Sequence, residues 1–161
     1  MTYEDLIKIK GINSAKACTI LAAQELVKRS LKISDETFPT VKSTKDVVAQ
    51  AGYLREKTRE HLMVLYLNAR DELLFKKHVF TGTLNASIVH PREIFQEAFN
   101  RNASSIIMVH NHPSGDPQPS EGDLRVTQNI KEAGKILGVE VKDHIIIGKN
   151  KVFSFKEHKL I

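Results

Sequence analysis

The chain has very little cysteine, and this scarcity limits the chemistry available to it. Cys18 is the only cysteine among 161 residues, so no disulfide can form within the chain. Zinc sites built from several cysteines are excluded for the same reason. Any metal ion must therefore be bound by histidine and carboxylate side chains.

Long hydrophobic runs are also absent. No stretch of about 18 consecutive apolar residues occurs, so we expect no membrane-spanning helix. Residues 1–10 carry charged side chains throughout and lack the apolar centre of a secretory signal peptide. Tryptophan, low-complexity tracts and internal repeats are missing as well. These absences predict a cytoplasmic protein that does not engage a membrane.

The remaining composition is ordinary for a folded protein. Hydrophobic residues make up 41% and charged residues 27% of the chain, which argues against disorder. Lysine and arginine exceed aspartate and glutamate by 24 to 19, and this net charge of +5 permits contact with nucleic acid without requiring it. The length suffices for one full core and a small appendage.

The spacing of apolar residues changes near residue 40. Capping residues predict a short helix that ends near Lys8 and a second helix that is capped by Ser14 and runs to about Arg29. A polar segment at 32–41 predicts a linker. We therefore place a helical hairpin with its linker at 1–40 and a second domain at 41–161. In that domain strands and helices mix without strict alternation, which predicts an α+β fold with a central mixed sheet flanked by helices. The expected strands lie near 61–67, 73–80, 84–89, 106–112, 139–147 and 152–155, and the expected helices near 43–52, 91–101 and 121–137.

His110, His112 and Asp123 form the pattern H-x-H-x10-D. Apolar residues at 106–109 predict a buried strand that ends at the histidines, and side chains two apart in a strand point to the same face. Three prolines within 113–119 predict a stiff loop that leads into the helix carrying Asp123. Two imidazoles and a carboxylate suit a divalent ion, most simply zinc with water in a fourth position.

Each part of this pattern also has a purely structural interpretation. A histidine at a strand end is usually a polar edge residue, and Ser120 to Asp123 form an S-x-x-D capping box that would only start a helix. However, two same-face histidines, a chain reversal and an inward carboxylate occur in order within fourteen residues. Their combination favours a metal site.

Hydrolysis of an amide bond needs a group that takes a proton from water and delivers it to the leaving nitrogen. Glu60, directly before the first predicted core strand, is the best candidate, although spacing alone favours a solvated charge in the polar run 55–60. Ser120 has a second predicted role, since its hydroxyl could donate to the developing oxyanion.

The set of Glu60, the two histidines, Ser120 and Asp123 resembles the JAMM (MPN+) metalloprotease motif. Several further stretches resemble the bacterial RadC family over residues 43–161: GTLN at 82–85, HPRE at 90–93, HNHPSG at 110–115, PS at 119–120 and DHII at 143–146. The resemblance implies a RadC-type JAMM domain whose sheet and helices are similar to those of zinc deaminases. It also implies one zinc ion per chain bound by His110, His112 and Asp123, with Glu60 as catalytic base and Ser120 as the motif serine.

Asp143 and His144 belong to the RadC pattern rather than to the general JAMM motif. They could support the metal ligands from behind or face the substrate, and an ion pair at a strand edge is an equally good interpretation. The ligand set does not fix the metal, because iron, manganese and nickel also accept two histidines and an aspartate.

The N-terminal segment resembles half of the helix-hairpin-helix region of RadC proteins, in a shortened form. Lys10, Gly11, Asn13 and Lys16 lie in the hairpin, whose backbone amides would receive a DNA phosphate. Asn13 replaces the usual second glycine, and we expect it to adopt a left-handed backbone. A helical cap that packs on the second domain is the competing interpretation.

Two functions from different classes follow. The first is a zinc-dependent hydrolase of peptide, isopeptide or related amide bonds in a peptide or protein substrate. The second is a DNA-associated repair or recombination factor whose metal is structural or vestigial. A nuclease ranks below both, because phosphodiester cleavage usually uses two metals or several carboxylates, and nucleobase deamination is excluded because its sites use cysteine ligands. Exposed strand edges also predict a homodimer.

Overall fold

The computed structural model describes residues 2–32, 38–82 and 89–161, without the side chains of residues 28–32. The strand predicted at 84–89, the GTLN stretch and the linker predicted at 32–41 therefore lie partly or largely outside the described residues. The chain divides into two compact units, residues 1–37 and residues 38–161.

The first unit is a hairpin of two helices, α1 (Tyr3–Ile7) and α2 (Ser14–Lys32). Thr2 and Asp5 form a reciprocal capping box that starts α1. Leu6 and Ala17 are buried, and the Tyr3 hydroxyl donates a hydrogen bond of 2.9 Å to Ser14 Oγ. These contacts hold the two helices of the hairpin together.

The turn between these helices differs from the prediction in two ways. Asn13 caps α2, since its side-chain oxygen accepts a bond of 3.0 Å from the Lys16 amide, so the expected cap at Ser14 was wrong by one residue. Gly11 has a φ of 91° and supplies the left-handed backbone that was expected at Asn13. Within the part of the chain that the structure describes, no helix has the length and apolar character needed to cross a membrane.

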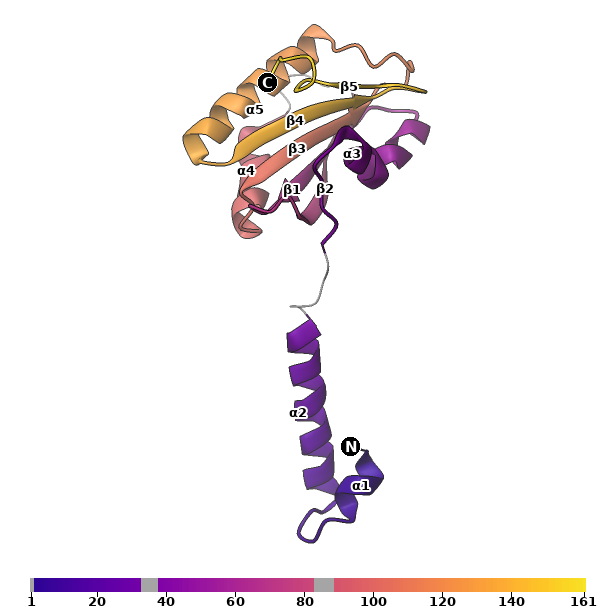
Figure 1. The fold of residues 1–161 in the computed structure, drawn as a ribbon, viewed down its shortest axis with the longest axis vertical. Coiled ribbons are helices and arrows are strands. Elements are labelled where there is room, and N and C mark those ends of the chain that lie inside the picture. The colour runs from indigo at the N-terminus through magenta and orange to yellow at the C-terminus, as the bar shows by residue number, and fades with distance from the viewer. Residues whose placement is uncertain (1, 33–37, 83–88) are drawn as a thin grey trace. The chain divides into compact units, whose positions relative to one another are not determined.

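The second unit is built on a five-stranded sheet in the order β2-β1-β3-β4-β5 (Figure 1). β1 runs antiparallel to β2 and β3, β3 and β4 are parallel, and β5 returns antiparallel to β4. The predicted mixed sheet is thus confirmed. The strands are β1 (His61–Leu67), β2 (Leu73–Thr81), β3 (Ser105–Asn111), β4 (Glu140–Ile147) and β5 (Val152–Ser154).

Helices cover both faces of this sheet (Figure 1). On one face α4 (Pro91–Asn100) and α5 (Glu121–Leu137) pack against Leu62 and Met108, and on the other α3 (Thr44–Ala51) and the 3-10 helix η1 (Gly52–Glu56) pack against Met63 and Val109. Alternation along β3 therefore directs His110 toward α5 and its neighbour Asn111 toward η1.

The end of the predicted linker is in fact part of the second unit. Val41 is buried, and its amide donates a bond of 2.7 Å to the carbonyl oxygen of Asp71. The Leu73 amide donates in turn to the carbonyl oxygen of Pro39 at 2.9 Å. Residues 39–41 thus lie as a short extended segment beside the start of β2.

Candidate metal centre

The structure brings His110, His112 and Asp123 together at one end of the sheet. His110 lies in β3, and His112 follows directly, where its amide donates a bond of 3.0 Å to the carbonyl oxygen of Ile147 at the end of β4. Asp123 lies in the first turn of α5. The side chains of His110 and Asp123 are fully buried, whereas that of His112 is 13% exposed and forms the solvent side of the cluster.

The three side chains lie close enough together to bind one metal ion, with the two histidines facing different oxygens of Asp123. His110 Nε2 lies 3.0 Å from His112 Nε2 and 3.2 Å from Asp123 Oδ1, and His112 Nε2 lies 3.4 Å from Asp123 Oδ2. Ligands bound to zinc at about 2.0–2.1 Å in a tetrahedron lie about 3.3 Å from one another. Among the described residues this is also the only group of three or more such side chains that could hold a metal.

The protonation of His112 supports a cation at the centre of this triangle. His112 Nδ1 lies 2.8 Å from the backbone carbonyl oxygen of Asp116. A carbonyl can only accept, so Nδ1 carries the hydrogen and Nε2 presents its lone pair to His110 and Asp123. Acceptor atoms facing one another at this distance repel unless a proton or a metal ion lies between them, and the donor set therefore fits zinc.

Asp123 is held rigidly by the start of its own helix. Its Oδ2 accepts hydrogen bonds from the Ser120 amide at 2.7 Å and from the Ser120 hydroxyl at 2.6 Å. Ser120 Oγ accepts in return from the Asp123 amide at 3.2 Å, which completes the predicted capping box. The single hydroxyl hydrogen of Ser120 thus points at the carboxylate, and an oxyanion role for Ser120 stays a prediction that requires this hydroxyl to turn.

Charge and burial act differently on the three predicted ligands. Burial opposes ionisation of Asp123, but the interactions of the carboxylate with His110, His112 and Ser120 outweigh burial and hold the pKa of this carboxyl well below its usual range. Burial lowers the pKa of His110 despite the opposing charge of Asp123. The hydrogen bond to Asp123 raises the pKa of His112, with a smaller contribution from the nearby Glu60 carboxylate. His112 is therefore the ligand at which a proton competes with a metal ion.

Glu60 is positioned by Asn111, the residue between the two histidines. Asn111 is fully buried, and its amide nitrogen donates to the carbonyl oxygens of Lys57 at 3.3 Å and Arg59 at 3.0 Å. Its side-chain oxygen accepts from the His61 amide at 2.9 Å. One side chain thereby fixes the backbone on both sides of Glu60 and ties it to the strand that carries the ligands.

A pocket of about 390 Å³ opens beside this segment and is lined by Thr58, Arg59, Glu60, Gly82 and Pro113. It joins the predicted base to the proline that follows His112. The larger pocket of about 710 Å³ includes Asp143, and neither pocket is lined by the three predicted ligands themselves, but only the smaller of the two includes Glu60 and the neighbour of His112. We therefore place the candidate reaction site at the smaller pocket.

The loop between His112 and Ser120 is braced by the turn that joins β4 and β5. The Lys149 amide donates a bond of 3.0 Å to the carbonyl oxygen of Gly115, and Arg55 Nε donates to the carbonyl oxygen of Gly148 at 3.0 Å. A Cβ atom at Gly148 would lie only 2.5 Å from Gly115 O and 3.0 Å from Pro117 Cδ. Glycine at 148 thus permits the close approach of the two segments.

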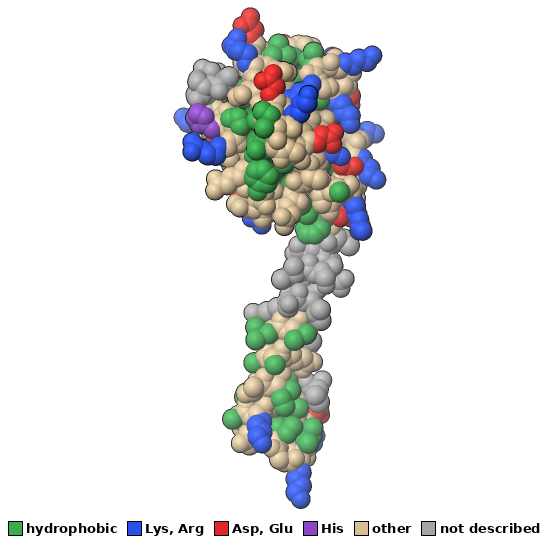
Figure 2. Space-filling view, turned by 90° about the vertical axis from the view of Figure 1, so that its left-hand side faces the viewer, with side chains coloured by type: hydrophobic (Ala, Val, Ile, Leu, Met, Phe, Trp, Pro, Cys, Tyr) green, Lys and Arg blue, Asp and Glu red, His purple; other side chains and the backbone are tan. Residues whose placement is uncertain are grey.

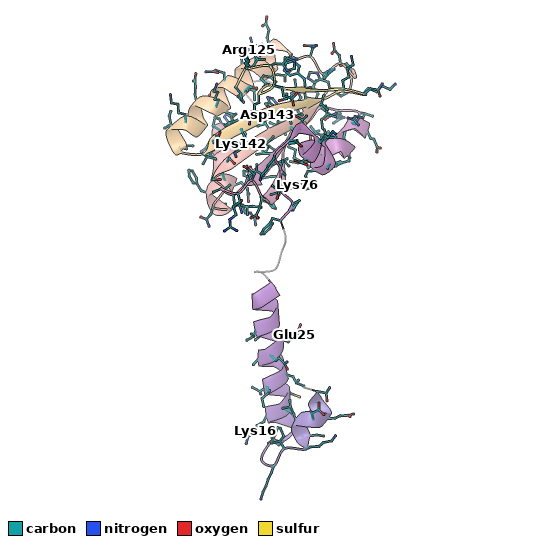
Figure 3. The ribbon with its side chains drawn as sticks, in the orientation of Figure 1. Lys16, Glu25, Lys76, Arg125, Lys142 and Asp143 are labelled. Carbon is teal, nitrogen blue, oxygen red and sulfur yellow. The ribbon has the colours of Figure 1, made fainter. Side chains whose placement is uncertain are left out.

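Asp143 and His144 are adjacent in β4 but serve different sites. Asp143 (labelled in Figure 3) accepts bonds from the amides of His144 and Lys156 and from the Ser154 hydroxyl, at 2.6–2.9 Å, and burial raises its pKa. It braces the chain after β5 and belongs to the larger pocket. His144 points to the other face, where its Nε2 lies 2.8 Å from His110 Nδ1.

The four residues predicted to bind DNA lie in the turn of the first unit. Lys10 and Gly11 are exposed, Asn13 caps α2, and Lys16 (Figure 3) donates from Nζ to the carbonyl oxygen of Gly11 at 2.9 Å. Lys16 is thus partly engaged within its own turn. DNA binding by this turn stays a prediction.

Three residues at the site were not singled out from the sequence: Asn111, Thr127 and Gly148. The side chain of Asn111 bonds to residues at 57–61, far away in the sequence, and no local pattern marks this partnership. Thr127 is different, because it lies four residues after Asp123, on the same face of a helix. Helical spacing from a predicted ligand was thus a usable signal for Thr127.

Similarity to known proteins agrees with the geometry. Residues 41–160 match the RadC-like JAB domain. UPF0758 proteins of Bacillus cereus, Bacillus anthracis and Bacillus thuringiensis subsp. konkukian are each 46% identical over 160 residues, which covers 97% of this chain and 70% of the relative. The sheet with its helices is the arrangement of a JAB/MPN-like domain, so the resemblance seen in the motifs is confirmed. The chain belongs to the RadC family.

Proposed function

We propose that this protein is a zinc-dependent hydrolase of amide bonds in peptide, protein or isopeptide-linked substrates. The observation that carries the proposal is the triangle of side chains formed by His110, His112 and Asp123. The two Nε2 atoms lie 3.0 Å apart, each lies 3.2–3.4 Å from one oxygen of Asp123, and one ligand atom from each residue lies within 4.8 Å of the others. The membership of the chain in a family with a JAB domain supports the same chemistry.

A zinc ion in this triangle supplies a Lewis acid that makes a nearby water easier to deprotonate. Glu60 takes the proton from the attacking water and delivers it to the leaving nitrogen. Asn111 keeps the backbone around Glu60 in register with the histidines through its three hydrogen bonds. The pocket beside Glu60 and Pro113 admits the substrate.

Ser120 and the loop behind it hold the carboxylate ligand. The hydroxyl and amide of Ser120 both bond to Asp123 Oδ2, so Oδ1 is the oxygen that remains to bind the ion. A carboxylate with one oxygen fixed by two donors loses little freedom when it binds a metal, and this preorganisation favours affinity.

The proposal is tested first by metal content. Protein purified without chelator should contain about one zinc ion per chain, and His110→Ala should remove it. Absence of metal, together with unchanged thermal stability of His110→Ala, would contradict the proposal.

The second step uses Glu60→Gln. Purified protein is incubated with a mixture of peptides and isopeptide-linked conjugates, and new termini are detected by mass spectrometry. We expect cleavage by the zinc-loaded protein and its loss in Glu60→Gln at unchanged zinc content. Zinc binding without any cleavage, equal in both proteins, would instead favour a structural metal in a DNA-associated factor.

A further inference from the structure

Two buried polar side chains lie behind His110. His144 Nε2 is 2.8 Å from His110 Nδ1, and His144 Nδ1 is 2.6 Å from Thr127 Oγ1. Thr127 Oγ1 also lies 2.6 Å from the backbone carbonyl oxygen of Asp123. Thr127 is 2% exposed and His144 is fully buried. A chain of three hydrogen bonds thus connects the backbone of one predicted ligand with the ring of another.

The bond between Thr127 and the Asp123 carbonyl fixes the position of every hydrogen along this row of hydrogen bonds. Two oxygen atoms at 2.6 Å repel unless a hydrogen lies between them, and the Asp123 carbonyl has none to give. The Thr127 hydroxyl must therefore donate to Asp123, and its lone pair must accept from His144 Nδ1. His144 thus carries its hydrogen on Nδ1.

The same reasoning continues to the metal ligand. His144 is fully buried against Phe155, whose ring stacks on it at a centroid distance of 4.8 Å. Its ring nitrogens bond to His110 and Thr127 rather than to a carboxylate, so a charge on this ring would have no compensating partner and the ring is neutral. A neutral imidazole has one hydrogen, so His144 Nε2 is an acceptor and His110 Nδ1 donates to it. His110 Nε2 is left with a lone pair that faces His112 and Asp123.

We propose that Thr127 and His144 are positioning residues that fix the tautomer of His110 and thereby set the affinity of the centre for zinc. The inference rests on the metal site of the proposed function. If the donors and acceptors of these hydrogen bonds were reversed, the hydrogen of His110 would lie on Nε2. There it would occupy the position that the ion needs. The Thr127 hydroxyl decides between these two arrangements, because its bond to the Asp123 carbonyl is the one bond whose donor and acceptor are fixed by chemistry.

Substitution of Thr127 separates the two directions. Thr127→Val keeps the shape but removes the hydroxyl, so His144 Nδ1 loses its acceptor and the hydrogen moves to His144 Nε2. His144 then donates to His110 Nδ1, and His110 carries its hydrogen on Nε2. Thr127→Ser keeps the hydroxyl and should keep the original tautomers.

Two measurements test this on the full chain. Long-range proton–nitrogen NMR of the metal-free protein reports which ring nitrogen of His110 and His144 is protonated, and competition with a chelator gives the zinc affinity. We expect hydrogens on Nδ1 of both rings in the natural protein and in Thr127→Ser, with equal zinc affinity. In Thr127→Val we expect hydrogens on Nε2 and a loss of affinity of about 10–100-fold, typical of groups behind a metal ligand.

A matched control is available in the first unit. The Thr19 hydroxyl donates to the carbonyl oxygen of Ala15 at 3.0 Å, the same bond within a helix but without a histidine behind it. Thr19→Val should leave zinc affinity unchanged.

Several outcomes would overturn the inference. These are a natural protein with the hydrogen of His110 on Nε2, an equal loss of affinity in Thr127→Ser and Thr127→Val, or no loss in Thr127→Val. The tautomers of the natural protein decide the direction of the chain even if Thr127→Val does not fold. These spectra need no metal, so they test the hydrogen-bond arrangement even if zinc does not bind. Failure of zinc to bind would contradict the proposed function alone.

Discussion

The end of the sheet that carries the histidines and the N-terminal hairpin differ in how firmly their functional side chains are held. At the sheet, His110, Asn111 and Asp123 are buried, and each is bonded to groups from other segments of the chain. In the hairpin, only Leu6 and Ala17 are buried among the described side chains of residues 2–27. The predicted DNA contacts there bond only within their own turn.

This difference shows what each region is built to do. A metal centre loses affinity when its ligands must be ordered on binding, so burial and cross-chain bonds favour it. The hairpin exposes several large apolar side chains together with its lysines (Figure 2), among them Ile7, Ile9, Ile20 and Leu26. Most of its described side chains lie at the surface, so substitutions there should cost little stability.

The largest expected effect comes from removing a ligand. His112→Ala deletes the solvent-side imidazole, so zinc affinity should fall by more than the ~100-fold typical of supporting residues. The stabilisation by zinc, about 4 kcal/mol at a thousandfold excess over the dissociation constant, should vanish with it. Thermal unfolding with and without chelator measures this loss. Lys16→Ala in the hairpin is the control, and equal zinc content in both variants would remove the contrast between the two regions.

Asn111→Ala should follow in size. The substitution leaves the carbonyl groups of Lys57 and Arg59 and the His61 amide, all in part-buried bonds, without their partner, which costs about 1–3 kcal/mol of unfolding free energy. Zinc content should be retained, because Asn111 points to the opposite face from His110, whereas cleavage should fall as Glu60 loses its support. Urea unfolding and metal analysis check both parts. A loss of unfolding free energy below ~0.5 kcal/mol, as found at surface positions, would show that the three hydrogen bonds of Asn111 are dispensable.

Gly148→Ala should have an intermediate effect. The new Cβ would lie 2.5 Å from Gly115 O, so the loop after His112 must shift, at a cost of about 1–3 kcal/mol. Zinc affinity should fall as well, because that loop carries the carbonyl of Asp116 that orients His112. Gly52→Ala is the matched control, since its Cβ would meet Val48 at an ordinary 3.4 Å. Equal unfolding free energies of the two variants would show that the short distance between Gly148 and Gly115 does not require glycine at position 148.

Zinc affinity should depend on pH through one proton. The pKa of His112 is raised, that of His110 is lowered, and that of Asp123 lies far below the working range. Below the pKa of His112, affinity should fall about tenfold per pH unit, because one proton must leave Nε2 before the ion binds. Above that pKa the affinity should be constant, and a slope of two would show that His110 titrates too.

In the metal-free protein, His112 makes the free energy of unfolding fall as pH rises. A raised pKa in the folded state means that His112 stabilises the metal-free protein below the ordinary histidine pKa. This contribution is lost as pH rises through the raised value. Chemical unfolding of the metal-free protein from below the ordinary histidine pKa to above the raised one should show this loss of unfolding free energy. His112→Ala should abolish the pH dependence.

The smallest effect on stability is expected in the hairpin. Lys10→Glu combined with Lys16→Glu should change the unfolding free energy by no more than about 0.5 kcal/mol, because both side chains lie at the surface. Zinc affinity should be unchanged. If the turn binds DNA, a salt-dependent gel shift with branched DNA should weaken and lose about two charges of salt dependence. DNA binding that persists unaltered would remove the hairpin from any nucleic-acid role.

Local patterns in the sequence were reliable wherever the physical cause is itself local. The capping box predicted at Ser120 forms, further capping boxes start helices at Thr2 and Ser43, and Gly138 ends α5 in a left-handed conformation. Alternation along a strand placed His110 and His112 together, which the distance between their Nε2 atoms bears out. Each of these features depends on residues within a few positions of one another.

Features that depend on distant partners could not be read in this way. The linker was predicted to extend to residue 41, but Val41 is buried because it pairs beside the start of β2. The motif spacing gave no hint that Asn111 would fasten the segment around Glu60, since those residues lie some fifty positions apart in the chain. The tautomer of His110 likewise depends on α5 and β4 lying against β3.

The amino-acid sequence by itself determined the ligand types, their order and the helix and strand that present them, because side-chain chemistry and backbone periodicity act over a few residues. Only the tertiary structure decided how far apart the ligand atoms lie, which groups stand behind them and which nitrogen of each ring is left to bind an ion. Those properties arise where separate strands and helices meet, because buried donors and acceptors there bond to partners that the linear order does not name.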